Sequence, residues 1–238
     1  MKTRSLLKET LVTAFNGKVL YGSDDSIHHD LSPLMIGQTE MKVLADKSPE
    51  ILFVTSYPPR ECGIATYSQD LIKAINNKFI NSLTIKVCAL ESGDVDFHYS
   101  DDVKYTLKTS LPDSYTGLSS KINEDDQIKI VLIQHEFGFF RKQEPAFLQF
   151  VEAIAKPVII VFHTVLSKPD NELKSKIKLI AAACDSIIVM THTSAEILMK
   201  DYDLPVDLIS VIAHGTHLVP HLNKNLLKKN MEQRDGKF

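Results

Sequence analysis

The sequence predicts an α/β fold, a doubly wound, mostly parallel Rossmann-like sheet with helices on both faces. Short apolar runs alternate with helical patterns from residue 51 to residue 212. The first run, Ile51–Thr55, is unbroken and rich in β-branched residues, which is typical of a strand buried on both faces of a sheet. No internal repeat or low-complexity segment interrupts the alternation. Strands that alternate with helices need right-handed crossovers, and these produce a parallel sheet covered on both sides.

The first strand and the helix after it form the best-defined unit. Pro58 and Pro59 end the strand because proline has no backbone N–H for the sheet. Apolar residues fall at helical spacing beyond Gly63, so a loop of about seven residues links the strand to a helix. In an open α/β sheet, ligands bind at such junctions, at the carboxyl ends of strands.

Six more strands and four more helices are expected along the chain. The strands are expected at 83–90, 103–107, 128–134, 157–162, 186–190 and 207–212, and the helices near 114–124, 145–155, 171–183 and 193–201. We therefore divide the chain into a Rossmann-like domain over 51–220, an N-terminal extension over 1–50 and a linker-like segment over 221–238. Turn signals such as Asn16-Gly17 break the pattern of the extension, whose role stays open.

Composition excludes several classes of protein. The formal net charge of -3 and the absence of a basic stripe give no electrostatic basis for binding nucleic acid or an anionic membrane. Lys8 and Glu9 interrupt the region where a signal peptide needs an apolar core, and no later apolar run approaches the length of a membrane span. The three cysteines lack metal-ligand spacing. We expect reduced thiols in a cytoplasmic protein.

The first candidate binding loop is Arg60-Glu61-Cys62-Gly63. A glycine allows close backbone approach, and the N-terminus of the following helix offers free amides suited to a phosphate or a sugar hydroxyl. The sequence has neither GxGxxG nor GxxxxGK[ST], so neither a dinucleotide fingerprint nor a P-loop is supported. A plain tight turn explains the same residues equally well.

Polar residues also follow four later strands. Gln134-His135-Glu136 precedes the apolar FGFF, which suggests a pocket with polar and apolar walls. His163-Thr164 follows a central strand, where a histidine is placed to bond a substrate or move a proton near neutral pH. A histidine satisfied by local backbone is the alternative. The last two groups are Thr191-His192 and His214-Gly215-Thr216-His217.

Two sharper hypotheses lack support from spacing. Zinc would use the histidines at strand ends, but no HExxH or paired CxxC occurs, and the adjacent His135 and Glu136 point to opposite faces of an extended chain. Cys62 near a helix start is a candidate nucleophile, but nothing in the sequence singles out a partner base.

Five stretches carry a resemblance to a known family. They are SYPPRECGIATYSQDL, IQHEFGFF, PVIIVFHTVL, DSIIVMTHTSAEIL and ISVIAHGTH. In this order and at these separations they resemble the N-terminal domain of glycosyltransferase family 4, especially a bacterial subgroup that reads YPPRxCGIAxF, QHEFGIF, HTV and IPHG. The resemblance covers roughly residues 50–220.

The resemblance implies one half of a GT-B fold, mainly the half that holds the acceptor. Such enzymes transfer a sugar, here of the hexosyl type, from a nucleotide-sugar donor with retention of configuration, usually without a bound metal and with no other cofactor. By motif, the loop of Arg60, Cys62 and Gly63 faces the acceptor and the donor phosphates, and His163 is the catalytic histidine that contacts the transferred sugar. The other residues implied to line the cleft are His135, Glu136, Thr164, Thr191, His214 and Gly215.

The family holds its nucleotide mostly with a second domain, which carries a Lys/Arg pair and spaced glutamates that this sequence does not contain. We therefore expect a fragment or truncated form that is inactive without the missing C-terminal GT-B domain. The alternative is a non-catalytic Rossmann-like binding or scaffolding module, which predicts an exposed apolar patch and self-association. The sequence names neither the donor sugar nor the acceptor.

Overall fold

The computed structural model describes residues 48–79, 83–93 and 97–215. Its strands are β1 (Glu50–Thr55), β2 (Thr84–Glu91), β3 (Val103–Lys108), β4 (Ile128–His135), β5 (Val158–Phe162), β6 (Ser186–Val189) and β7 (Ile209–Val211). Its helices are α3 (Gly63–Lys78), α4 (Pro112–Glu124), α5 (Phe137–Phe140), α6 (Glu144–Ala153), α7 (Asn171–Ala183) and α8 (His192–Lys200), with a 3-10 turn, η1, at Val206–Leu208.

The strands form one parallel sheet in the order β3-β2-β1-β4-β5-β6-β7. The predicted Rossmann-like fold class is confirmed. The chain runs outward from β1 to β3, then returns to the other side of β1 to lay down β4 and the later strands. The strand order therefore reverses between β1 and β4, and in open α/β sheets the crevice outside such a reversal is where ligands bind.

β1 is the centre of two hydrophobic cores because its residues are buried on both faces of the sheet. Leu52 and Val54 pack in the cluster that includes residues of α4, α6, α7 and α8. Ile51 and Phe53 pack in the cluster on the α3 side. Phe53 is fully buried between Val87 of β2 and Leu132 of β4 in the register of the sheet. An unbroken apolar strand is what this two-sided burial requires.

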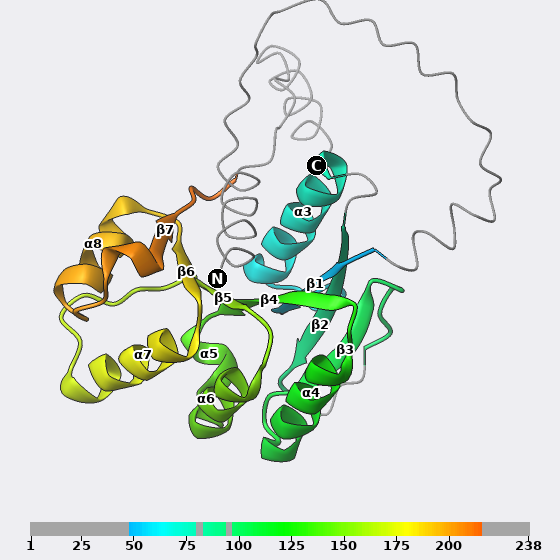
Figure 1. Cartoon of the computed structure of the whole chain (residues 1–238), viewed down its shortest axis with the longest axis horizontal. Helices are drawn as coiled ribbons and strands as arrows, with labels where there is room; N and C mark the ends of the chain where they lie inside the picture. Colours follow the sequence, from blue (N-terminus) through cyan, green and yellow to red (C-terminus); the bar gives the residue numbers. More distant parts are fainter. Residues whose placement is uncertain (1–47, 80–82, 94–96, 216–238) are drawn as a thin grey trace, which may run out of the picture.

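Among the described residues, more helices cover one face of the sheet than the other. Figure 1 shows α3 on one side of the sheet and α4, α6 and α7 on the other. α8 packs near β6 and β7, and its Ala195 and Leu198 belong to the same core cluster as α4, α6 and α7. α3 therefore covers the central strands on its own face, with Ile72 and Ile75 pointing into that core.

The structure adds two details to the predicted elements. FGFF forms the short helix α5, which the sequence did not suggest, because the side chain of Glu136 accepts a bond from the Phe137 amide and caps it. The last strand is shorter than expected, since residues 206–208 form η1. The linker-like segment 221–238 and nearly all of the extension 1–50 lie outside the described residues.

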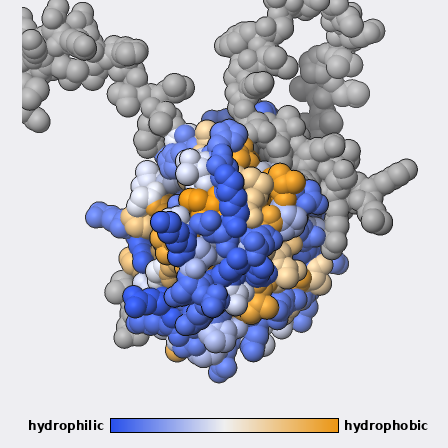
Figure 2. All heavy atoms as spheres, turned by 90° about the vertical axis from the view of Figure 1, so that its left-hand side faces the viewer, coloured by the Kyte–Doolittle hydropathy of each residue, from blue (hydrophilic) through white to orange (hydrophobic). Residues whose placement is uncertain are grey.

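Within the described ranges, no helix is long and apolar enough to cross a membrane. The face seen in Figure 2 carries small hydrophobic areas separated by hydrophilic side chains rather than one continuous apolar patch. The large apolar side chains that are clearly exposed among described residues are Leu111, Leu166, Leu179 and Val206. Scattered apolar residues of this kind are normal on a protein surface.

Candidate functional site

The carboxyl ends of the parallel strands bring the candidate residues to one edge of the sheet. His163 directly follows β5, and Gln134 lies near the end of the neighbouring strand β4. Gln134 pairs with Val161 in the register, and residues two apart on a strand share a face, so Gln134 and His163 both point to the α3 side. The site is therefore built between β4, β5 and the first turns of α3.

A short hydrogen bond joins the two side chains. His163 Nε2 lies 2.6 Å from Gln134 Oε1, and Gln134 is fully buried. The backbone amide of His163 also donates to the His135 carbonyl at 3.1 Å. Because both its ring and its backbone are held by β4, His163 has a defined orientation at the strand end.

Tyr67 of α3 contacts two histidines. Its ring packs edge-on against His163 with the centroids 5.3 Å apart, and against the His214 ring at 4.7 Å. His214 is exposed, and its Nδ1 lies 2.6 Å from the Gly215 carbonyl oxygen. We call Tyr67, Gln134, His163 and His214 the histidine cluster. The cluster joins α3 to the carboxyl ends of β4, β5 and β7.

The histidine cluster holds His163 in its neutral form. Burial, with a smaller contribution from the charge of His214, lowers the pKa of His163 to about 4. Burial also raises the pKa of the Tyr67 hydroxyl to about 12. Of the two roles expected for this histidine, to bond a substrate or to move a proton near neutral pH, the lowered pKa favours the first, because an imidazole desolvated in this way resists taking a proton. At pH 7 it acts as an uncharged hydrogen-bonding group.

His135 does not line the crevice as the sequence suggested. It is the last residue of β4, its ring is 3% exposed, and four phenylalanine rings surround it at centroid distances of 4.8 to 5.7 Å. Burial lowers its pKa to about 3, with the charge of His163 adding to the effect. Its neighbour Gln134 points to the opposite face, so the alternation of the strand sends His135 into the core.

Glu136 and Thr164 form a second polar contact beside the cluster. Thr164 donates its hydroxyl hydrogen to Glu136 Oε2 at 2.7 Å, while Glu136 Oε1 accepts from the Phe137 amide at 3.1 Å. Both carboxylate oxygens are thus engaged. Glu136 ties the loop after β5 to the start of α5, which makes it a positioning group in this structure.

The loop from Arg60 to Gly63 lies at the carboxyl end of β1. Cys62 caps α3, with its sulfur accepting from the Ala65 amide at 3.4 Å and lying 3.1 Å from Ser56 Oγ. Arg60 donates to the Leu90 carbonyl at 3.3 Å. A Cβ added at Gly63 would meet nothing within 4 Å, so packing does not require glycine there. The start of α3 is therefore exposed at Gly63.

The other predicted residues lie at the ends of β6 and β7. Thr191 caps α8, since its Oγ1 accepts from the Ser194 amide at 3.0 Å. Gly215 follows His214, and a Cβ there would also meet nothing within 4 Å. Thr191 is therefore a capping residue in this structure, while His214 belongs to the histidine cluster through its contact with Tyr67 and the exposed Gly215 follows it.

Two alternative chemistries find no support in the described part of the chain. No group of three or more His, Cys, Asp or Glu there is close enough to hold a metal ion. All three cysteines are free thiols. The contacts of the Cys62 sulfur in these residues are a hydroxyl and a backbone amide, so no histidine activates it as a nucleophile.

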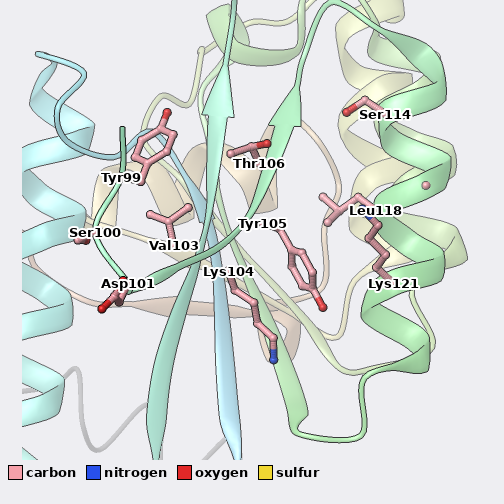
Figure 3. A pocket seen from close by; sticks show the side chains of 11 residues that line it. Tyr99, Ser100, Asp101, Val103, Lys104, Tyr105, Thr106, Ser114, Leu118 and Lys121 are labelled. Atoms are coloured by element: carbon pink, nitrogen blue, oxygen red, sulfur yellow. The ribbon is translucent and has the colours of Figure 1, made fainter. Parts of the chain in front are cut away.

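A groove of about 580 Å³ lies elsewhere, along the edge strand β3. Figure 3 shows Tyr99 and Asp101 on one side of the strand and Leu118 and Lys121 of α4 on the other. The groove borders a side of the sheet, whereas the histidine cluster stands at the carboxyl ends of the central strands. We place the candidate site at the cluster because the strand order reverses next to it.

The fold is similar to that of a solved glycosyltransferase structure. Neither a protein-family model nor a curated protein matches the sequence. A glycosyltransferase from Rickettsia africae ESF-5 is similar with a TM-score of 0.53 and 14% identity, over 79% of this chain and 50% of that one. An alpha-glucosyltransferase in complex with UDP and DNA containing an HMU base gives a TM-score of 0.45 and 14% identity, over 70% of this chain and 42% of that one. At this sequence identity, the similarity concerns the fold alone.

The chain spans 50% of the length of the Rickettsia structure. The sequence placed Gln134 in the polar wall of a pocket beside His135 and Glu136 but did not pair it with His163, and it indicated Tyr67 only as one of the apolar positions of a helix. The available signals were the Tyr67 phenol near a helix start and the Gln134 amide on a buried strand. Neither indicated that the two side chains would meet His163.

Proposed function

We propose that this chain is the acceptor-side half of a retaining, hexosyl-type glycosyltransferase of the GT-B kind, related to family 4. It would act on a nucleotide-sugar donor and a sugar or glycoconjugate acceptor, in the cytoplasm and without a metal or other cofactor. The observation that carries the proposal is the neutral His163, oriented by Gln134 beside the reversal of strand order. Two further observations support it: a fold similar to a solved glycosyltransferase and a span of 50% of that structure.

His163 is assigned to the transferred sugar. A neutral imidazole forms hydrogen bonds to hydroxyl groups without adding charge to the site. Tyr67 and Gln134 limit the ring's movement, so little orientational freedom is lost when a ligand binds. The Glu136–Thr164 contact holds the adjacent loop in place.

The exposed start of α3 is assigned to the departing phosphate. A leaving nucleoside diphosphate develops negative charge, and preorganised amides at a helix N-terminus stabilise such charge. Of these amides, that of Ala65 is taken by the Cys62 cap, so the amides of Gly63 and Ile64 are the ones assigned to the phosphate, and Arg60 supplies a cation at the same loop. The rest of the nucleotide is assigned to a C-terminal GT-B domain, which would also exclude water from the cleft.

A transfer assay tests the proposal. The longest polypeptide that the gene encodes and the 238-residue chain are incubated with a panel of labelled nucleotide hexoses and sugar acceptors. We expect transfer by a polypeptide that includes a donor-binding domain and none by residues 1–238 alone. His163→Ala should lower kcat/KM by about 10- to 100-fold, the loss of one or two hydrogen bonds to the substrate.

His98→Ala is the matched control, because His98 is exposed and lies outside the site. It should leave kcat/KM unchanged. Absence of transfer with every donor, in a folded polypeptide that carries both domains, would contradict the enzyme assignment. It would leave a binding module as the remaining reading of the fold.

A further inference from the structure

We infer that Gln134 is a positioning residue that fixes His163 as the tautomer protonated at Nε2, so that Nδ1 accepts a hydrogen bond from a sugar hydroxyl. This inference rests on the proposed function, which supplies the sugar as the ligand. It goes further by giving His163 one hydrogen-bonding polarity and by naming the residue that imposes it.

The contact distance determines which amide atom faces the ring. Gln134 Oε1 and His163 Nε2 are 2.6 Å apart, slightly shorter than the usual range of an N–H···O bond. Nitrogen is the larger of the two amide atoms, so an N–H···N contact would be longer. Gln134 therefore presents its oxygen, which accepts only, and His163 Nε2 must carry the hydrogen.

Burial keeps Gln134 in this role. The side chain is fully buried, and its Nε2 has no hydrogen-bond partner within the described residues. It lies on the sheet face that α3 covers, above the apolar side chains of Leu132 and Val161. The bond to His163 is therefore the one hydrogen bond that this side chain makes among the described residues.

The surroundings leave Nδ1 as an acceptor. The ring of His163 contacts Tyr67 of α3, and Tyr67 also contacts the ring of His214. No carboxylate of the described residues pairs with the imidazole, so nothing favours the cation. Among the described residues, the ring nitrogens of His163 make one hydrogen bond, and it is made by Nε2.

This polarity selects among ligand groups. A hydroxyl can donate to the Nδ1 lone pair, but an ionised phosphate or carboxylate oxygen can only accept and is repelled by it. His163 therefore recognises a hydroxyl of the transferred sugar. The site should therefore prefer a hexose over a hexuronic acid whose carboxylate would occupy the position of that hydroxyl.

Nuclear magnetic resonance of the 238-residue chain with isotope-labelled histidine tests the inference without any sugar. At pH 7 we expect His163 to show a protonated Nε2 and an unprotonated Nδ1. Gln134→Leu removes the acceptor and should produce a mixture of both tautomers. Gln134→Glu retains an acceptor oxygen, so it should keep the Nε2-protonated form and raise the pKa of His163 by about 1–3 units.

Gln149→Glu is the control, since Gln149 is an exposed residue of α6 that should not affect His163. A wild-type His163 protonated at Nδ1, or one whose tautomer is unchanged in Gln134→Leu, would overturn the inference. If Gln134→Leu does not fold, the tautomer of His163 in the wild type and the pKa of His163 in Gln134→Glu test the inference. A correct tautomer combined with failed sugar transfer would refute the proposed function alone.

Discussion

His135 and His163 show how neighbouring strand ends give one residue type two different environments. Both follow apolar strands and lie at the same edge of the sheet. His163 turns toward α3 and meets polar partners, whereas His135 is enclosed by phenylalanines, with Nδ1 lacking a partner in the described residues. Each ring must stay neutral in the fold, because burial is the main cause of both lowered pKa values.

This burial predicts acid sensitivity. The unfolded chain takes up protons at both histidines below about pH 6.5, while folded His135 and His163 resist protonation down to about pH 3 and 4. The unfolded state therefore binds more protons, and the stability present above pH 6.5 falls as the pH is lowered toward these values. At pH 5 the loss should be about 2 kcal/mol for each histidine.

Urea unfolding at pH 7.5 and pH 5 measures this loss. His135→Phe, which matches the aromatic surroundings, should reduce the difference between the two pH values, whereas exposed His98→Ala should not. Equal pH dependence in the wild type and His135→Phe would show that His135 takes up its proton without unfolding.

At the scale of single elements, helix starts differ in how well they are capped. Cys62 caps α3, Asp170 caps α7 and Thr191 caps α8 with their side chains. α3 is further tied to the end of β1, since Thr55 Oγ1 lies 2.7 Å from Ser68 Oγ. α4 instead begins after Leu111, whose side chain cannot cap, with a proline in the first turn. No side-chain hydrogen bond caps this helix start.

Leu111→Asp should therefore stabilise the fold. Leu111 has the extended backbone of an N-cap and is 51% exposed, so little burial is lost when it is replaced. An aspartate there can accept from an amide of the first turn and also opposes the positive end of the helix dipole. The free energy of unfolding in urea should rise by about 1 kcal/mol.

Leu166→Asp provides the comparison for this substitution. Leu166 is 47% exposed and belongs to a loop, so its replacement changes the same side chain without supplying a cap. A similar gain in both variants would assign the effect to surface polarity or charge rather than to capping.

At the scale of the whole molecule, the carboxyl and amino ends of the strands carry different groups of interacting side chains. The carboxyl ends hold the histidine cluster. Near the amino ends, Lys104 of β3 lies 2.6 Å from both Glu50 of β1 and Asp125, which precedes β4. Burial alone would lower the pKa of Lys104, but its bonds to Asp125 and Glu50 raise it above the ordinary value. This ion network joins three neighbouring parts of the sheet far from the candidate site.

Lys104→Met should therefore affect stability without affecting the site. The change leaves the buried Glu50 carboxylate without its cation, and removal of one partner from a partly buried pair should cost about 1–3 kcal/mol in urea unfolding. The His163 tautomer should be unchanged. Lys129→Met, at an exposed position of β4, should leave stability nearly unaltered. A changed His163 spectrum in Lys104→Met would show that the two ends are coupled.

Much of the fold could be predicted because strands and helices depend on local patterns. The unbroken run Ile51–Thr55 indicated a doubly buried strand, and Pro58 and Gly63 indicated where the strand ends and the helix begins. Alternation of strands and helices then indicated a parallel sheet and placed polar residues at its carboxyl edge. These features need only neighbouring residues to be specified.

The site depended on contacts between distant residues. Gln134 and His163 lie 29 positions apart, and only the pairing of β4 with β5 makes them meet. The same pairing, with the packing of α5 and α6, sends His135 into a core of phenylalanines instead of a crevice. The sequence by itself therefore determined which elements form and which strand ends are polar. The tertiary structure decided which side chains face each other, because strand order and side-chain burial arise only when the whole sheet is assembled.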